Sequence, residues 1–490
     1  MSPRRVGALF FLGSFLIQLA WISAVPPYRG IDEYDHVYRA AAVAHGDWGI
    51  DHSPASRGRG VLLAVPPPRI VTDGTEICEA FEYTGHDNCH PVGRATDDLV
   101  YVASAAMYNP VFYWLIGTPA LLSDGAGAVY LMRLAASLLC ASLVALAAGT
   151  LAAWSRSVWS LIGLSLALTP VCLFSTAMPA PNGLEMVSAL CVYVGLFGLG
   201  RSDDSTSRLC LATSIVGLVV LLPLRILSPL WAALIVATAL LVVGLRRSVI
   251  AARRHPALVI TGIAAVTLSS AYALWWTWIT VGPTPGLETA SSSGDLPGNP
   301  WSMAGRALPL WIFQSIAAFP TRTEPAPSIV YAVSLLALVV FLCRSALRAG
   351  ARARLGMATC ALVSLALPFV FTVATYAQAG PIWQGRYGLP YSFGVVLIAA
   401  LAVNTLPASH RLRIGVPVAM AAFLAIAMTV SVVAVQLRQI KISPLSEDPR
   451  WLMAPTWLVA ILTLAGIAMF VITWRQSCSR SYEHLAASPS

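Results

Sequence analysis

A charged segment follows the first hydrophobic run of the chain. Residues 30–39 read GIDEYDHVYR and hold three acids, a histidine and an arginine, although only 11% of the chain is charged. Positions i, i+3, i+4 and i+7 would share one face of a helix, and here they are Asp32, Asp35, His36 and Arg39. Such a cluster could bind a divalent cation, deprotonate a hydroxyl or bind a phosphate. The alternative is a solvated helix start whose acids are favoured by the helix dipole.

A second polar cluster, YAQAGPIWQGRY at residues 376–387, stands at the end of a later apolar run. Arg386 is a candidate phosphate ligand, since a guanidinium can bind phosphate through two hydrogen bonds. Gln384 is a further candidate for substrate binding. The aromatic residues that could stack on a sugar ring are Trp383, Tyr387 and Tyr391. An aromatic belt with a snorkelling arginine would explain the same residues.

A third polar segment, MPAPNGLE at residues 178–185, lies between two apolar runs. Asn182 suits a helix N-cap and Glu185 suits the first turn, so capping and the helix dipole explain both. A functional role would require this turn to face the outer side of the membrane. Two arginines near apolar runs, Arg133 and Arg225, are either functional or anchored by snorkelling at helix ends.

The elements that must position these residues are membrane helices. The chain has 490 residues, 57% of them hydrophobic, and its mean hydropathy is +0.72. Repeated apolar runs of about 17–25 residues are typical of a polytopic membrane protein, and such spans are helical because lipid satisfies no backbone hydrogen bond. The net charge of +9 comes mostly from arginines in short loops, as the positive-inside rule expects. It therefore indicates no nucleic-acid partner.

The hydropathy pattern gives 13 candidate spans: 6–25, 107–122, 128–150, 158–177, 184–200, 209–224, 227–245, 257–281, 328–343, 354–376, 387–404, 413–435 and 452–474. Arginines near both ends predict that both termini are cytoplasmic. Thirteen crossings would separate the termini, so we expect 12, although 11 or 13 stay open. The pair 209–224 and 227–245 is the favoured place for one crossing to be lost.

The predicted organisation is a single helical domain without a separate soluble part. Its segments are a first transmembrane helix (1–25), an extracytoplasmic loop with the acidic motif (26–106), transmembrane helices (107–281), a second outer loop with an interfacial or re-entrant helix (282–327), further transmembrane helices (328–474) and a cytoplasmic tail (475–490).

Two cysteines, Cys78 and Cys89, stand apart from the apolar runs, in the first outer loop. A disulfide between them would suit an oxidising outer compartment. A zinc site is disfavoured because no second pair of ligands has suitable spacing. The sequence has no Walker-type loop and no GxSxG, HExxH or CxxC motif, so no cytosolic nucleotide site is expected.

Several motifs together resemble one family: RGIDEYDHVYRA after the first span, then YNPVFYWL, YLMRLAASLL, MPAPNGLE and QGRYGLPY. The chain resembles the GT-C class of membrane glycosyltransferases and, more closely, the bacterial membrane family of domain of unknown function 2142, over about residues 6–435. The resemblance implies an all-α, GT-C-like bundle of about 12 transmembrane helices with a large first outer loop. Asn182 stands where an aspartate is expected, which argues against a metal site in that turn.

The same resemblance implies a function in the bacterial plasma membrane. The protein would transfer a sugar from a polyprenyl-phosphate donor to an envelope glycan or lipid on the outer face. Asp32, with Glu33, would act as the base for the acceptor hydroxyl. A Mg²⁺ or Mn²⁺ ion, if used, would be held by Asp32, Glu33 and His36. Arg386 would stabilise the departing phosphate, and His36 and Arg39 would contact the substrate.

Two other functions stay open at this point. A transporter or flippase for a lipid-linked saccharide could use the acidic cluster as a proton or cation site. A non-catalytic partner of an envelope complex would need the same residues only for association.

Overall fold

The computed structural model describes residues 1–49, 61–63, 68–80, 92–93, 99–155, 157–201, 203–281, 299–321, 324–380, 382–403, 410–443 and 445–486. The helices in these ranges are α1 (Pro3–Ala24), α2 (Glu33–Ala44), α3 (Pro68–Ala80), α4 (Pro110–Gly117), α5 (Gly125–Trp154), α6 (Val158–Ala167), α7 (Pro170–Thr176), α8 (Pro181–Leu199), α9 (Asp204–Leu221), α10 (Ser228–Val243), α11 (Leu245–Arg253), α12 (Pro256–Val281), α13 (Pro300–Ile316), α14 (Ser328–Ala346), α15 (Ala351–Ala379), α16 (Leu389–Val403), α17 (His410–Ile442) and α18 (Thr456–Ala486).

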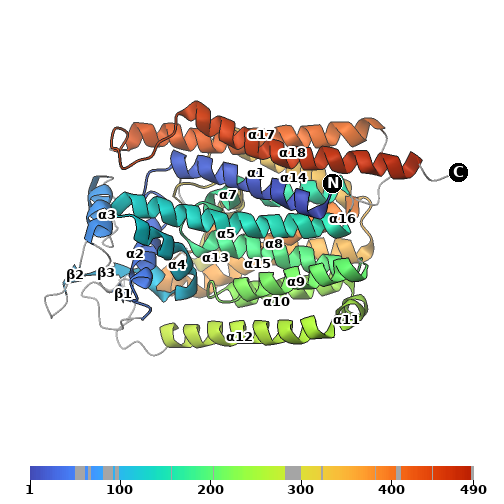
Figure 1. The fold of residues 1–490 in the computed structure, drawn as a ribbon, viewed down its shortest axis with the longest axis horizontal. Helices are drawn as coiled ribbons and strands as arrows, with labels where there is room; N and C mark the ends of the chain where they lie inside the picture. Colours follow the sequence, from blue (N-terminus) through green and yellow to red (C-terminus); the bar gives the residue numbers. More distant parts are fainter. Residues whose placement is uncertain are drawn as a thin grey trace.

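Most of these helices run side by side along the long axis of the molecule (Figure 1). At one end lie α2, α3, α4 and three short strands, β1 (Val61–Leu63), β2 (Val92–Gly93) and β3 (Leu99–Ala103), with β1 and β2 both antiparallel to the central β3. The start of α1 and the end of α18 point to the opposite end. We call the end that carries α2 the α2 end.

Ten to twelve segments of the described chain have the length and composition of a membrane span. Ten single helices are long and apolar enough, and two bent pairs raise the count to as many as 12. The pairs are α6 with α7, bent by 69°, and α10 with α11, bent by 99°. The helical, polytopic fold is confirmed, and an even number of crossings agrees with both termini lying at one end.

The predicted span at 107–122 forms no helix long enough to count as a candidate span. Asn109 caps α4, which has eight residues and passes into a 3-10 helix, η3 (Thr118–Leu122). Eight residues span about 12 Å, far less than the ~30 Å hydrocarbon core. Within 209–245, α9 is a candidate span on its own, whereas α10 counts as one only together with α11, from which it is bent by 99°. The loss of a crossing within 209–245 therefore stays a prediction.

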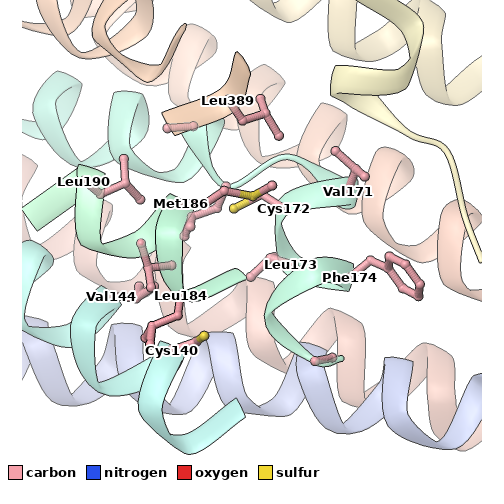
Figure 2. Packing of buried hydrophobic residues seen from close by; sticks show 14 of the residues in the cluster. Cys140, Val144, Val171, Cys172, Leu173, Phe174, Leu184, Met186, Leu190 and Leu389 are labelled. Carbon is pink, nitrogen blue, oxygen red and sulfur yellow. The ribbon is translucent and has the colours of Figure 1, made fainter. Parts of the chain in front are cut away.

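The core centres on α8, whose apolar segment is 94% buried. Figure 2 shows Cys172 and Leu173 of α7 on the side of Met186 and Leu184 of α8, with Phe174 pointing the other way. Phe174 packs edge-on against Trp21 of α1, with ring centroids 5.1 Å apart. The break at Thr169-Pro170, where the Thr169 side chain caps α7, lets this short helix turn into the core.

Glycines allow the first and last helices to approach closely. A Cβ atom on Gly13 of α1 would lie 2.7 Å from the carbonyl oxygen of Gly466 in α18, and one on Gly466 would lie 2.5 Å from that of Gly13. Small residues commonly permit such backbone contact between membrane helices. The contact closes the bundle between segments more than 400 residues apart in the chain.

Two elements near the α2 end position the second polar cluster. The 3-10 turn η4 (Gly385–Gly388) precedes α16 and lies against α13. The Gly385 N–H donates to the Gln314 side chain of α13 at 2.9 Å, and a Cβ on Gly385 would collide with the Trp311 carbonyl. As expected for an interfacial or re-entrant helix, α13 is not among the candidate spans, and it contains Pro309.

Candidate active site

Asp32 lies at the N-cap of α2, but its carboxylate does not cap the helix. Its backbone is left-handed, with φ 55° and ψ 22°, and its side chain makes no capping hydrogen bond. The carboxylate is 46% exposed, and Arg386 Nη2 donates to Asp32 Oδ2 at 3.3 Å. The sequence interpretation required these two residues to meet, and the fold brings them together across 354 positions of the chain.

His36 lies behind Asp32 in the first turns of α2. Its Nδ1 is 2.7 Å from the Tyr113 hydroxyl, and its ring stacks near those of Tyr108 and Tyr113. Burial lowers the pKa of His36 to about 3, against the opposing effect of Asp32 and with a further contribution from the positive charges of Arg225 and Arg386. His36 is therefore a neutral partner of Tyr113 rather than a cation for a phosphate.

Glu33 occupies a different position from the one expected of a catalytic acid. Its side chain is fully buried, and both carboxylate oxygens accept hydrogen bonds from Arg133 at 2.7 Å. One of these oxygens also accepts the Gly30 N–H at 2.8 Å. Arg133 binds the carbonyls at the end of α1 as well, so the pair fixes the α1–α2 connection. This geometry leaves Glu33 no free oxygen for a substrate.

Arg39 also departs from its expected role in substrate binding. Its side chain is buried and donates to the backbone carbonyls of Asp47, Trp48 and Gly49, at 3.5, 3.4 and 3.1 Å. Arg39 thus ties the chain after α2 back to the helix. Of the four residues predicted to share one helix face, only Asp32 is exposed, because Asp35, His36 and Arg39 are buried.

The expected metal ligands do not converge. Across the described residues, no group of three or more His, Cys, Asp or Glu side chains is arranged to hold a metal ion. Glu33 is bound to Arg133 and His36 faces Tyr113, so neither can join Asp32 around a cation. The donor set offers a divalent cation only one accessible carboxylate.

The segment 383–386 carries several buried polar atoms without a partner in the part of the chain described. These atoms are Trp383 Nε1, Gln384 Oε1 and Arg386 Nε, in side chains of residues no more than 6% exposed. A buried donor or acceptor without a partner costs about 1–3 kcal/mol, a cost that a bound ligand or water would offset. Tyr391, in contrast, is a core residue that stacks on Trp231 and hydrogen-bonds Thr238.

Two residues outside the predicted set join this site. Arg225, in the turn between α9 and α10, lies 4.5 Å from the Tyr387 ring centroid, and Arg386 lies 5.4 Å from the same centroid. Glu185 of α8 accepts from Arg225 Nη1 at 3.3 Å and from Ser228 at 2.7 Å. Sequence reasoning explained Glu185 by the helix dipole alone. The sequence feature that could have indicated this pair is an isolated acid, Glu185, and an isolated arginine, Arg225, in neighbouring apolar runs.

Comparison with known families identifies the chain. The model of a family described as "Predicted membrane protein (DUF2142)" matches residues 15–395. The chain belongs to this family. The matched part of this DUF2142 protein contains Asp32, Glu185, Arg225 and Arg386. None of the curated proteins matches the chain.

Solved structures give a weaker likeness. ArnT from Cupriavidus metallidurans bound to undecaprenyl phosphate is 13% identical, with a TM-score of 0.44, and the alignment covers 95% of this chain and 76% of that one. The apo form of the same ArnT is 12% identical, with a TM-score of 0.41 and coverages of 93% and 74%.

An apolar cavity of this DUF2142 protein is lined in part by residues at the start of α16 and at the end of α13. It has a volume of about 210 Å³ and lies between α6, α14, α16 and α17. Its lining includes Leu389, three residues after Arg386, and Ser315, next to Gln314. The proposed disulfide between Cys78 and Cys89 cannot be placed, because Cys89 and the side chain of Cys78 lie outside the described residues.

Proposed function

We propose that this protein is a membrane glycosyltransferase that uses a polyprenyl-phosphate-linked sugar and acts at the outer face of the bacterial plasma membrane. The acceptor is an envelope glycan or lipid. The observation that carries the proposal is the contact between the half-exposed Asp32 carboxylate and the buried Arg386 guanidinium at the α2 end. The contact places an accessible base and a buried cation at the same end of the bundle, where one substrate could contact both.

Asp32 is suited to the acceptor side of this reaction. An alcohol is a weak nucleophile until a base takes its proton, and a positioned base contributes about 10²–10⁴-fold to such a step. Asp32 is the acid of the motif that water or a hydroxyl can reach, since Glu33 is sealed against Arg133. Its backbone is left-handed, and its carboxylate makes no capping hydrogen bond to α2. Unusual backbone conformations often accompany function.

Arg386 is suited to the donor side. As the acceptor oxygen bonds to the anomeric carbon, the bond from that carbon to the phosphate oxygen breaks. The electron pair leaves with the polyprenyl phosphate, and the hydroxyl proton goes to Asp32. A fixed guanidinium stabilises the charge that develops on the leaving oxygen. Attack from the side opposite to the departing phosphate would invert the anomeric carbon.

The apolar cavity beside η4 supports a lipid-linked donor. Leu389, Phe393 and Phe423 line it, and it begins close to the chain segment that holds Arg386. A volume of about 210 Å³ accommodates part of a prenyl chain. A donor with its phosphate at Arg386 could place its first isoprene units there and extend the rest into the bilayer.

The experiment is Asp32→Asn in a strain that lacks the chromosomal gene. The amide keeps the size and the tolerance for a left-handed backbone but cannot accept the proton. We expect the glycan or glycolipid made by the wild type to fall to about 1% or less, in line with the loss of a general base. Mass spectrometry of envelope glycans and lipids measures this loss.

Glu447→Gln is the matched control, because Glu447 is an exposed acid in the α17–α18 loop, away from Arg386. It should complement fully. Full complementation by Asp32→Asn would refute the proposal. A transporter would move a lipid-linked saccharide across liposomes without a change in its mass, and an assembly partner would show neither transfer nor transport.

A further inference from the structure

We propose that Arg225 is a second phosphate-binding residue of this site and that Glu185 is the residue that positions it. The inference rests on the proposed function, because it concerns the phosphate of the same lipid-linked donor. It adds a guanidinium that approaches the phosphate from the turn between α9 and α10, whereas Arg386 approaches from η4.

The guanidinium of Arg225 lies close to two tyrosine rings. Its Cζ atom is 4.5 Å from the centroid of Tyr387 and 5.7 Å from that of Tyr108. Rings on which a guanidinium stacks hold it through cation–π attraction and leave its edge available for hydrogen bonds. Arg225 is thus oriented by its surroundings before any ligand arrives.

Glu185 fixes the remaining freedom of that guanidinium. Its Oε2 accepts from Arg225 Nη1 at 3.3 Å, and its Oε1 accepts from Ser228 Oγ at 2.7 Å. The Glu185 side chain is only 1% exposed, so a substrate does not reach it. A buried ion pair is costly to form. The start of α8 does not require an ion pair between Glu185 and Arg225. We therefore attribute this pair to the orientation of Arg225.

Unpartnered donors around Tyr387 show what the ligand must supply. Arg225 Nε, Arg386 Nε and Trp383 Nε1 are buried atoms without an acceptor among the described residues. Arg386 and Trp383 are themselves 5% and 4% exposed. A ligand that satisfies them must present several acceptors and negative charge, and a phosphate monoester or diester has both. The inferred ligand is therefore the phosphate group between the prenyl chain and the sugar.

The test measures binding rather than turnover. Purified full-length protein in detergent is titrated with undecaprenyl phosphate and, separately, with uncharged undecaprenol. We expect Arg225→Gln to weaken binding of the phosphate lipid by about 10-fold or more, the loss of a charge-assisted hydrogen-bonding group. Binding of undecaprenol should stay within about 2-fold of wild type, because the prenyl contacts are unchanged.

Further variants separate charge from position. Arg225→Lys keeps the charge but not the planar fork, so it should recover only part of the affinity. Glu185→Gln keeps the bond from Ser228 and should lower the ratio of phosphate-lipid to undecaprenol affinity by about 3-fold or more. Arg69→Gln is the control, since Arg69 is 79% exposed and lies in α3, away from Tyr387. Melting temperature and gel-filtration profile identify any variant that is misfolded.

The outcomes distinguish this inference from the proposed function. If folded Arg225→Gln and Arg225→Lys both bind the phosphate lipid as the wild type does, the inference is wrong even when transfer requires Asp32. If binding depends on Arg225 but the protein transfers no sugar, the inference stands and the transferase proposal fails. Competition by millimolar inorganic phosphate without any preference for the phosphate lipid over undecaprenol would assign the site to free phosphate and overturn the lipid assignment.

Discussion

Two adjacent acids, Asp32 and Glu33, have opposite surroundings. The Asp32 side chain is 46% exposed beside Arg386, whereas Glu33 is fully buried and bound to Arg133. An exposed ion pair contributes about 0–1 kcal/mol to stability, while the loss of one partner of a buried pair costs about 3–5 kcal/mol. The two residues should therefore respond differently to the same change of acid to amide.

Glu33→Gln is predicted to destabilise the protein by about 3–5 kcal/mol, because Arg133 would keep its charge without a counter-ion. Asp32→Asn should cost less than Glu33→Gln, because water reaches the Asp32 carboxylate and screens its pair with Arg386. Thermal unfolding of the purified proteins in one detergent compares them, with Glu447→Gln as the neutral control. An unfolding temperature of Glu33→Gln equal to that of Asp32→Asn would contradict the structural role assigned to Glu33.

At the residue scale, the sequence predicted the acid and the arginine that meet but not the second ion pair. Asp32 and Arg386 stand in polar motifs, where ionisable residues attract notice. Glu185 and Arg225 each have an ordinary local explanation, a helix dipole and a snorkelling side chain. Their contact depends on how α8 packs beside the turn after α9, which no local pattern encodes.

At the scale of elements, the approach of η4 to α13 sets the position of Arg386. Gly385 lies so close to α13 that any Cβ would strike the Trp311 carbonyl, and its N–H binds Gln314. Gly388 ends the same turn, yet a Cβ there would meet nothing within 4 Å. These two glycines form a matched pair for testing whether the contact matters.

Gly385→Ala is predicted to lower transfer by about 100-fold, since a displacement of about 1 Å at a catalytic site can have that effect. It should also weaken binding of undecaprenyl phosphate, because Arg386 moves with η4. Gly388→Ala should leave transfer and binding near wild type. Equal activities of the two variants, measured by envelope mass spectrometry and lipid titration, would show that the α13 contact does not position Arg386.

Secondary-structure elements were predicted well where the length of an apolar run is enough to indicate a membrane helix. The long runs became helices, and the non-spanning nature of α13 was visible from Arg306, Pro309 and Gln314 within it. The run at 107–122 misled because its composition is apolar, while Asn109 and Pro119 restrict α4 to eight residues. Apolar composition indicates that a segment is buried or in lipid, but capping residues and prolines determine how long its helix is.

At the scale of the whole molecule, the bundle gathers distant parts of the chain at the α2 end (Figure 1). Glu324 binds both Arg29 and Arg438, which joins the segment before Asp32 to the end of α17. Arg450 binds Asp73 of α3 and so joins the α17–α18 connection to the segment between α2 and α5. These ties explain how a half-exposed acid keeps a fixed position at one end of the helices.

The final prediction concerns the topology of the first half of the chain. If 107–122 does not cross, the connection after α2 and the connection before α5 lie on one side of the membrane, and Arg201 lies on the other. Alkaline phosphatase, which is active only outside the cytoplasm, should be active when fused after Gly46 and after Ser123, and inactive after Arg201. Green fluorescent protein at the same points should give the reverse pattern. An inactive phosphatase after Ser123 would mean that 107–122 crosses; the α2 end would then lie on two sides of the membrane, and no single outer site could be formed by Asp32 and Arg386.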